Sequence, residues 1–436
     1  MFASRGKFIS FCLPLNSMKI VIVGGFGYKD IGDEAILKTM LLRLRYEIPG
    51  VDITVLSINP EDTALQHNVK SLHSYSRCFK GKKGMLRAIK HFLWTFLPRT
   101  PTAWLLIEPP LRLTLQEMDS AELVISSGGG FLNEVFRKDL LPRLFEIAMI
   151  KRMRKKLMLY GQTIGPFYSR SIKLLVSLIL NHVDIISVRD EGSRRILTEL
   201  GVDKPPIFLT SDEAILLPSA DATRVKQILS GEGIALGNNP VIGITARTWF
   251  HLHPYQNLEI AKKKFENYKQ VIASSADFLV ENLDAEILFI PMQTLSKHPY
   301  DDDRNIALEI KSKMNRRDKA NIIMNQYRPE EIKGIIQNTD LLIGTRFHSL
   351  LFAATTGVPI VSISYWFKID DFMRVMGQEK YNCDINDITV DDLINKCMDA
   401  WSKRLQIRKS LLEKSEKLKQ KALLNAKLAR YLLYAI

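Results

Sequence analysis

From Met18 onward, short runs of β-branched and aliphatic residues alternate with longer amphipathic stretches, and this alternation constrains the fold more than any other feature. The runs have the length of buried strands, and the stretches between them have the apolar spacing of helices that pack through one face. Strands that alternate with helices form parallel sheets covered on both sides. In the first half of the chain the pattern predicts strands at 19–23, 52–57, 123–126, 157–160 and 184–188, and helices at 34–46 and 140–155.

The alternation loosens over residues 221–239 and then starts again. A chain of 436 residues is also too long for one ordinary core. We therefore expect an α/β protein with two Rossmann-like, doubly wound domains that face one another across a central cleft. The second domain has predicted strands at 241–245, 286–290, 321–323, 341–343 and 360–363.

Five segments are expected along the chain. A leader precedes the first clean strand pattern and is expected to be disordered. The first domain carries a basic amphipathic insertion at about 75–118, and the second domain is followed by a basic C-terminal helix. The leader, the two domains and the helix are placed at 1–17, 18–220, 221–400 and 401–436.

Composition excludes several classes of protein. No apolar run approaches the length of about 20 residues that a membrane-spanning helix needs. The apolar stretch 8–15 is short, is broken by Pro14 and has no small-residue cleavage site behind it, which argues against a signal peptide. Four cysteines lie far apart without metal-ligand spacing, which fits a reducing compartment and argues against a disulfide framework: Cys12, Cys78, Cys383 and Cys397. We therefore expect a cytoplasmic protein, and we expect no bound cofactor or metal.

The net charge of +14 is concentrated in two segments. Residues 74–100 contain seven lysines or arginines and no acidic residue, and residues 401–436 contain ten against two. The rest of the chain is close to neutral. A general nucleic-acid-binding surface is therefore not expected.

Residues 83–97 combine positive charge with an apolar helical face. That face carries Met85, Ile89, Phe92 and Phe96, and Lys83, Arg87 and Lys90 lie around the other side. Such a helix suits reversible contact with the anionic inner face of a membrane, or a cover over the cleft. The alternative, held equal, is that the apolar face packs on the first domain. For 401–436, packing back onto the first domain is the favoured interpretation.

A glycine-rich loop, GGFGYKDIGDE, follows the first predicted strand at 24–34. Glycines allow a ligand to approach the backbone, and the N–H groups at the start of the next helix can hold an anion or a hydroxyl. The loop lacks the spacing of nucleotide-binding loops. Asp33 is a candidate acceptor-binding residue here, with simple capping of the helix as the equal alternative.

Three more strand ends of the first domain carry glycine or polar clusters. Because the carboxyl ends of parallel strands meet at one edge of a sheet, these clusters predict a ligand site. The segment 126–134, SSGGGFLNE, offers a bare backbone shelf and side chains for sugar hydroxyls. The next two clusters are GQTIGP at 161–166 and SVRD at 187–190. The candidate residues are Gly129, Gly130, Asn133, Glu134, Gln162 and Arg189.

The most specific motif is DLLIGTRFHSL at 340–350. A strand delivers Arg346 and His348 to its carboxyl end at alternate positions, just beyond Gly344. Arginine matches carboxylate or phosphate oxygens with a planar fork, and histidine exchanges protons near neutral pH. The neighbouring arginine favours a functional histidine over a structural one.

Two further clusters contain side chains that could bind a metal ion. Asp301, Asp302 and Asp303 precede a helical pattern, so a helix cap is favoured over a metal site. His251 and His253, with Arg247, could line the cleft, but they lack a third metal ligand.

Taken in order, these motifs resemble those of the polysaccharide pyruvyl transferase family over residues 18 to about 381. The shared marks include DIGDEA, GGGFL, GQTIGP, SVRDE, RFHSL with GVP, and SYWFK. The resemblance implies a fold like that of B-type glycosyltransferases, with the active site between two Rossmann-like domains. It also places the family's basic donor-binding and catalytic residues on Arg189, Arg346, His348 and Lys368.

The resemblance implies transfer of pyruvate from phosphoenolpyruvate to a sugar of a cell-surface or exopolysaccharide precursor, as a ketal. His348 would serve as general acid or base, Arg189 and Arg346 would bind the anionic groups, and Lys368 would bind phosphate or transfer a proton. Whether His348 or Lys368 donates the proton stays open. The alternatives are a sugar-nucleotide glycosyltransferase of the same shape and a non-catalytic adaptor for membranes or polysaccharides.

Overall fold

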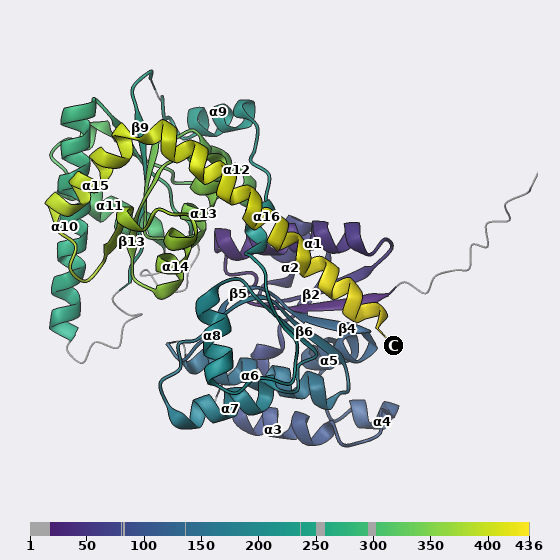
Figure 1. Ribbon diagram of the computed structural model, residues 1–436. Helices are drawn as coiled ribbons and strands as arrows, with labels where there is room; N and C mark the ends of the chain where they lie inside the picture. Colours follow the sequence, from purple (N-terminus) through teal and green to yellow (C-terminus); the bar gives the residue numbers. More distant parts are fainter. Residues whose placement is uncertain are drawn as a thin grey trace, which may run out of the picture.

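The computed structural model describes residues 18–79, 81, 83–135, 137–235, 237–249, 258–294 and 302–435. The predicted leader at 1–17, His251, His253 and Asp301 lie outside the described residues. Two α/β domains face one another, and the last helix lies across both (Figure 1).

The first domain is built on a parallel sheet in the order β3-β2-β1-β4-β6-β7-β8, with β5 paired to β6. Alternate residues of β1 enter different cores, Ile20 and Ile22 on one face and Val21 and Val23 on the other. Both faces are therefore covered, as the continuous apolar runs predict. The strands are β1 (Lys19–Val23), β2 (Asp52–Ser57), β3 (Lys70–His73), β4 (Leu123–Ser126), β5 (Gly129–Leu132), β6 (Lys156–Ile164), β7 (Ile185–Val188) and β8 (Ile207–Leu209).

Helices of the first domain lie in three groups. One face of the sheet carries α1 (Ile31–Glu47) and α2 (Pro60–His67) (Figure 1). The other carries α5 (Pro109–Ser120), α6 (Arg137–Arg152), α7 (Arg170–Leu180) and α8 (Glu191–Glu199). The predicted insertion begins with the 3-10 helix η1 (Tyr75–Phe79) and continues with α3 (Gly84–Trp94) and α4 (Pro101–Trp104), on the same side as α5 and α6.

The second domain repeats the plan with a parallel sheet in the order β11-β10-β9-β12-β13-β14. The predicted fold class, two doubly wound domains, is confirmed. The strands are β9 (Val241–Thr245), β10 (Glu286–Phe289), β11 (Ala320–Ile322), β12 (Leu341–Gly344), β13 (Ile360–Ser364) and β14 (Asn382–Asp384). The helices are α9 (Ala222–Gly231), α10 (Leu258–Leu283), α11 (Asp303–Lys313), α12 (Pro329–Gln337), α13 (Phe347–Thr356), α14 (Phe367–Val375) and α15 (Val390–Ser402).

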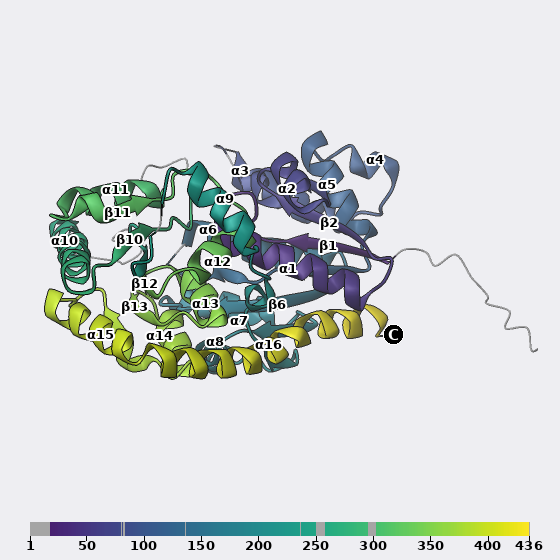
Figure 2. The ribbon, with the colours of Figure 1, turned by 90° about the horizontal axis from the view of Figure 1, so that it is seen from above.

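Helix α16 (Arg404–Tyr434) joins the two domains (Figures 1 and 2). Its first half contributes Ile407 and Leu411 to the core of the second domain. Its second half contributes Ala426, Ala429, Leu432 and Leu433 to the core that α1 shares with the first sheet. Between them, the buried amide of Asn425 donates to the carbonyl of Ser211 (3.1 Å) and accepts from the hydroxyl of Ser187 (2.8 Å). The basic C-terminal segment is therefore an interdomain tie.

Helices long and apolar enough to cross a bilayer are absent from the described part of the chain.

Candidate active site between the two domains

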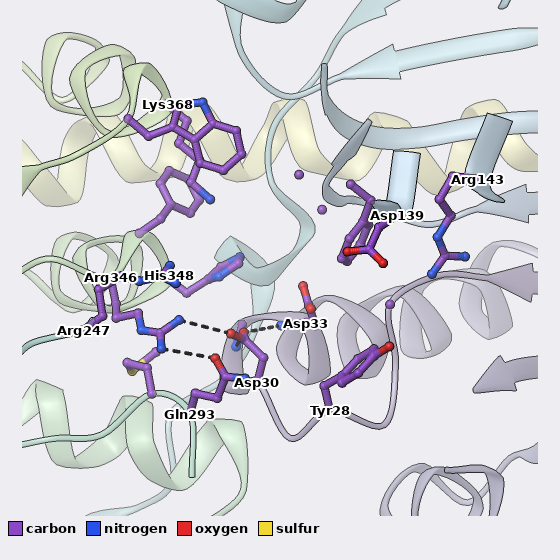
Figure 3. A pocket seen from close by; sticks show the side chains of 18 of the residues that line it. Tyr28, Asp30, Asp33, Asp139, Arg143, Arg247, Gln293, Arg346, His348 and Lys368 are labelled. Atoms are coloured by element: carbon purple, nitrogen blue, oxygen red, sulfur yellow. Dashed lines mark hydrogen bonds and ion pairs between the residues drawn. The ribbon is translucent and has the colours of Figure 1, made fainter. Parts of the chain in front are cut away.

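A cavity of about 500 Å³ lies between the domains, at the carboxyl ends of their strands. Switch points of doubly wound sheets are the usual ligand sites of such folds. Figure 3 shows that Arg247, Arg346, His348 and Lys368 of the second domain face Tyr28, Asp33 and Asp139 of the first domain across this cavity. The two walls differ in charge: the wall of the second domain is mainly basic.

The start of α1 forms part of the first-domain wall. Asp30 caps the helix by accepting from the backbone N–H groups of Gly32 (2.9 Å) and Asp33 (3.2 Å). The cap is therefore Asp30, and the alternative in which Asp33 caps the helix is wrong. Asp33 instead lines the cavity, where burial and the neighbouring carboxylates of Asp30 and Glu34 raise its pKa well above the ordinary value.

The same loop touches the second domain. The backbone N–H of Ile31 donates to the carbonyl of Met292 (2.9 Å), and Asp30 pairs with Gln293 in an isolated β-bridge. A Cβ built on Gly32 would lie 1.8 Å from Nδ1 of His348. Only glycine at position 32 leaves room for the histidine of the other domain, which explains the last glycine of the first loop.

Arg346 is held from behind by a buried carboxylate. Its Nε and Nη2 donate to the two oxygens of Asp303 (2.9 and 2.5 Å), and Nη2 also reaches Gln293 (3.2 Å). Nη1 lies 3.6 Å from Asp30 of the first domain. Although burial opposes the charge, Asp303 and Asp30 raise the pKa of Arg346, so the guanidinium is permanently charged.

Asp302 and Asp303 have different roles at the start of α11. Asp302 is the N-cap of α11, which confirms the favoured interpretation for that residue. Asp303 is buried and accepts from the backbone N–H groups of Met292 and Gln293 as well as from Arg346. Among the described residues no group of three acidic, histidine or cysteine side chains is arranged to hold a metal ion.

Asp212 links Arg189 to His348. Its carboxylate accepts from Nη1 of Arg189 and lies 3.4 Å from Nε2 of His348. Burial favours the neutral acid, but Arg189 and then His348 outweigh it and hold the pKa of Asp212 well below its usual range. Nε of Arg189 donates to the hydroxyl of Thr163 (2.7 Å), so the arginine is fixed on two sides.

Lys368 and Arg247 supply positive charge to the second-domain wall, where Asp30 acts on Lys368, and Asp303 on Arg247, only through longer-range electrostatic attraction. Neither has an ion pair within the described residues, and the ammonium of Lys368 lies 4.6 Å from the centre of the Trp366 ring. Burial lowers the pKa of Lys368, and the cations Arg189 and Arg247 lower it further, whereas Tyr365 opposes them. Nη1 of Arg247 donates to the hydroxyl of Tyr365 (2.8 Å).

The direction of the pKa shift of Tyr365 indicates a positive electrostatic potential at this wall of the cavity. Burial alone would raise the pKa of its phenol, yet Arg247, Lys368 and Arg346 lower it below the ordinary value. This wall of the cavity therefore favours negative charge.

Two helix N-termini add to that preference. α13 begins after Arg346 and α14 begins after Trp366, and neither has a side-chain cap. The free N–H groups of an uncapped helix start, together with the helix dipole, stabilise a bound anion. His348 and Lys368 lie in the first turns of these two helices.

The structure brings together only part of the predicted acceptor set. Asp33, Gly129 and Gly130 line the cavity, and a Cβ on Gly130 would lie 3.3 Å from Trp366 of the facing domain. Gly129 has φ +142°, a conformation that favours glycine.

The other members of that set do not line the cavity, because their polar groups hold the backbone. The amide of Asn133 donates to the carbonyl of Gly130 (2.5 Å). Glu134 accepts from the N–H groups of Tyr168 (2.6 Å) and Ser169 (2.9 Å) ahead of α7. Gln162 donates to the carbonyl of Ser126 (3.3 Å).

Gly344 also lies outside the lining. A Cβ there would meet Leu350 at 2.6 Å, so its role is the close packing of β12 on α13.

Several cavity or supporting residues were not identified from sequence. Asp212 and Asp303 look like ordinary helix caps, and Tyr365 looks like the end of a buried strand. Tyr28 lies within the first glycine-rich loop but was not singled out there, and Asp139 and Arg143 stand apart from any motif. Signals existed for Tyr28, which lies in the first glycine-rich loop, and for Tyr365, which lies in the SYWFK segment just beyond a predicted strand of the second domain.

The two facing parallel sheets and the interdomain cavity define a two-domain α/β protein of the B-type glycosyltransferase architecture. Solved structures share it: a glycosyltransferase from Rickettsia africae ESF-5 has a TM-score of 0.61 at 11% identity and matches 97% of this chain and 100% of that chain. UDP-GlcNAc 2-epimerase from Neisseria meningitidis, bound to UDP-GlcNAc, has a TM-score of 0.61 at 11% identity, with 96% and 100% covered. These similarities establish the fold alone.

The chain belongs to the polysaccharide pyruvyl transferase family, whose model matches residues 30–366. It is also 21% identical to the amylovoran biosynthesis protein AmsJ of Erwinia amylovora over 392 residues, which cover 87% of this chain and 91% of that protein. The resemblance noted from the motifs is confirmed, and the protein is a polysaccharide-modifying transferase.

Proposed function

We propose that this protein transfers pyruvate from phosphoenolpyruvate to a sugar of an exopolysaccharide or cell-surface precursor, forming a ketal. The observation that carries the proposal is the excess of positive charge on the second-domain wall, where Lys368 and Arg247 have no ion pair among the described residues and Tyr365 has a lowered pKa. Phosphoenolpyruvate carries a phosphate and a carboxylate, and it needs two such anion sites close together.

The donor-binding residues fall into two groups. Lys368, Arg247 and the N-termini of α13 and α14 bind the two anionic groups directly. Arg189 and Arg346 each give two of their nitrogens to neighbouring side chains. Nη2 of Arg189 is the nitrogen assigned to the donor, whereas Nη1 of Arg346 would be shared between the donor and Asp30, which lies 3.6 Å away. Asp212 and Asp303 keep both guanidinium planes fixed, so little side-chain freedom is lost on binding.

The reaction forms two C–O bonds at C2 of phosphoenolpyruvate, the first by addition and the second by displacement of phosphate. A sugar hydroxyl attacks C2 of phosphoenolpyruvate while C3 gains a proton from His348 or Lys368, and this gives a tetrahedral phosphate ester. A second hydroxyl of the same sugar then attacks C2, the C–O bond to phosphate breaks, and inorganic phosphate leaves. One hydroxyl proton replaces the proton given to C3, and the other leaves with phosphate. Asp33 on the first-domain wall, whose pKa is raised by burial and by the neighbouring carboxylates, takes up and passes on these protons.

Phosphoenolpyruvate is expected to stabilise the protein, and UDP-glucose and UDP-GlcNAc are not. A ligand at 100 times its dissociation constant adds about 2.7 kcal/mol to the free energy of unfolding. A thermal-shift titration with the three compounds measures this. The reverse order of stabilisation would contradict the proposal and favour a sugar-nucleotide glycosyltransferase.

Product analysis tests the reaction itself. The protein is incubated with phosphoenolpyruvate and a panel of lipid-linked or nitrophenyl sugars. The expected product gains the mass of pyruvate less one water, and one inorganic phosphate is released for each product molecule.

Gly32→Ala is expected to lower turnover by about 100-fold, because the added methyl group displaces the ring of His348 from its place between the domains. The matched control is Gly231→Ala, where a built Cβ has no heavy atom within 4 Å. Turnover of both variants is measured together with their thermal unfolding. Near-normal turnover of Gly32→Ala at unchanged stability would show that the position of His348 does not matter.

We further propose that the acceptor is carried on a lipid and that the protein works at the cytoplasmic face of the inner membrane. The support is the basic, apolar insertion at 75–118, which lies beside the cavity through Ser76 and Phe79.

A further inference from the structure

Helix α3 is packed with its more apolar face turned outward. Its buried positions are Gly84, Ala88, His91 and Trp94. His91 is fully buried and pairs with Glu108 (2.7 Å), and Trp94 packs on Trp104 of α4 at 4.5 Å between ring centres. These contacts fix the orientation of the helix against η1, α4 and α5.

The outward side of this insertion is rich in exposed apolar side chains. Eight large apolar side chains on α3, α4 and the residues after them are each 42% to 68% exposed, and we call them the α3–α4 apolar face: Met85, Leu86, Ile89, Leu93, Phe96, Leu97, Leu105 and Leu106. Single exposed apolar residues are normal on protein surfaces, but a cluster of this size marks an interaction site.

The face differs from the stripe predicted from the sequence. Met85, Ile89 and Phe96 are on it, as expected. Phe92 is half-buried and packs on Phe145 of α6 at 5.9 Å between ring centres. Leu86 and Leu93 take the outward positions instead, so the exposed stripe is rotated about the helix axis.

Positive charge borders the α3–α4 apolar face. Lys83, directly before α3, and Lys90 on α3 are exposed, and residues 74–100 contain no acidic residue. The carboxylate of Glu108 lies 3.9 Å from Lys90 and 3.8 Å from Arg87, so it offsets part of this charge. Like charge on two copies of this surface opposes self-association, whereas an anionic bilayer complements both its charge and its apolar side chains.

The face also lies next to the acceptor side of the cavity. Ser76 and Phe79 of η1 line the cavity, and α3 starts five positions later with Gly84 packed on the backbone of Phe79. A surface bound to α3 and α4 therefore comes close to the cavity wall that carries Asp139 and Arg143.

We propose that the α3–α4 apolar face is a docking surface for anionic phospholipid bilayers and that it presents the cavity to acceptors held in the membrane. The proposal that the protein docks on bilayers depends only on this surface. The proposal that docking presents the cavity to an acceptor rests on the proposed function. Apolar side chains enter the region between headgroups and acyl chains, and Lys83 and Lys90 contact lipid phosphates.

Vesicle flotation tests docking. The full-length protein is mixed with vesicles of phosphatidylglycerol and phosphatidylcholine, or of phosphatidylcholine alone, at low and high salt. Wild-type protein is expected to float with the anionic vesicles at low salt and to be released in part by high salt, because salt screens the lysines. Equal binding to neutral vesicles, or none to anionic ones, overturns the proposal.

Matched variants locate the surface. The double variant Ile89→Ser, Leu93→Ser is expected to bind anionic vesicles at least tenfold more weakly, with unchanged unfolding temperature because both side chains are exposed. The control Leu65→Ser removes an exposed leucine from α2 on the opposite face of the sheet and should bind like wild type. Wild-type vesicle binding by the double variant, or conversion of a dimer to a monomer without any vesicle binding, contradicts the proposal.

The phosphoenolpyruvate thermal shift separates the two proposals. A double variant that loses vesicle binding but keeps the shift and keeps turnover of a soluble acceptor supports docking. If the protein floats with vesicles but phosphoenolpyruvate does not raise its unfolding temperature, the docking proposal is supported and the proposed function is contradicted.

Discussion

Turnover of the His348→Ala variant is expected to fall by about 10³-fold, the usual contribution of a positioned acid or base, while phosphoenolpyruvate still raises its unfolding temperature. His348 lies where the reaction needs a proton, between Gly32 of the first domain and Asp212, with Nε2 3.4 Å from the carboxylate. The donor keeps Lys368, Arg247 and two helix N-termini, so its binding survives the change. Steady-state turnover and a thermal-shift titration measure the two effects.

A control and a companion variant sharpen this test. His182→Ala removes an exposed histidine at the end of α7 and should leave turnover unchanged. Lys368→Arg keeps the positive charge but removes an amine with a lowered pKa. If it is as inactive as His348→Ala, Lys368 donates the proton; if it keeps most of its turnover, the proton comes from His348. Near-normal turnover of His348→Ala would remove the histidine from the mechanism.

The Asp303→Ala variant is expected to lose about 3–5 kcal/mol of unfolding free energy, because it leaves the charge of Arg346 buried without its partner. Arg346 and Asp303 are 7% and 3% exposed, so water cannot replace the lost carboxylate. Chemical denaturation of the purified variant measures the loss.

Two further variants measure how much the ion pair between Asp303 and Arg346 contributes to stability. The neighbouring Asp302→Ala removes only the cap of α11 and a more exposed ion pair with Arg304, and it should cost about 1 kcal/mol. Adding Arg346→Met to Asp303→Ala should recover most of the lost stability, since no buried charge remains, but not donor binding. A loss for Asp303→Ala no larger than that for Asp302→Ala would show that the pair contributes little.

Sequence patterns predicted the sheets and the place of the cavity because both depend on local order along the chain. Arg189, Arg346 and His348 each follow a parallel strand, and the ends of such strands meet at one edge. Asp303 could not be assigned in this way. It precedes Arg346 by more than 40 positions, and an aspartate at a helix start satisfies the pattern of a cap equally well.

Helix α3 shows a second limit of sequence patterns. Periodicity identifies residues that share a face, but not which face the rest of the protein covers. The hydrogen bond of buried His91 with Glu108 and the packing of Trp94 decide the orientation, and neither contact is visible in the helical pattern itself.

The last helix of the chain completes the core of the first domain, so the order of synthesis and the order of folding differ. Ala426, Ala429, Leu432 and Leu433 cover the sheet face on which α1 packs. Until α16 has been synthesised and released from the ribosome, this face is open and exposes apolar strands and helix to solvent or chaperones. The domain that is made first is therefore the one that matures last, and loss of even a few terminal turns of α16 damages the beginning of the protein rather than its end.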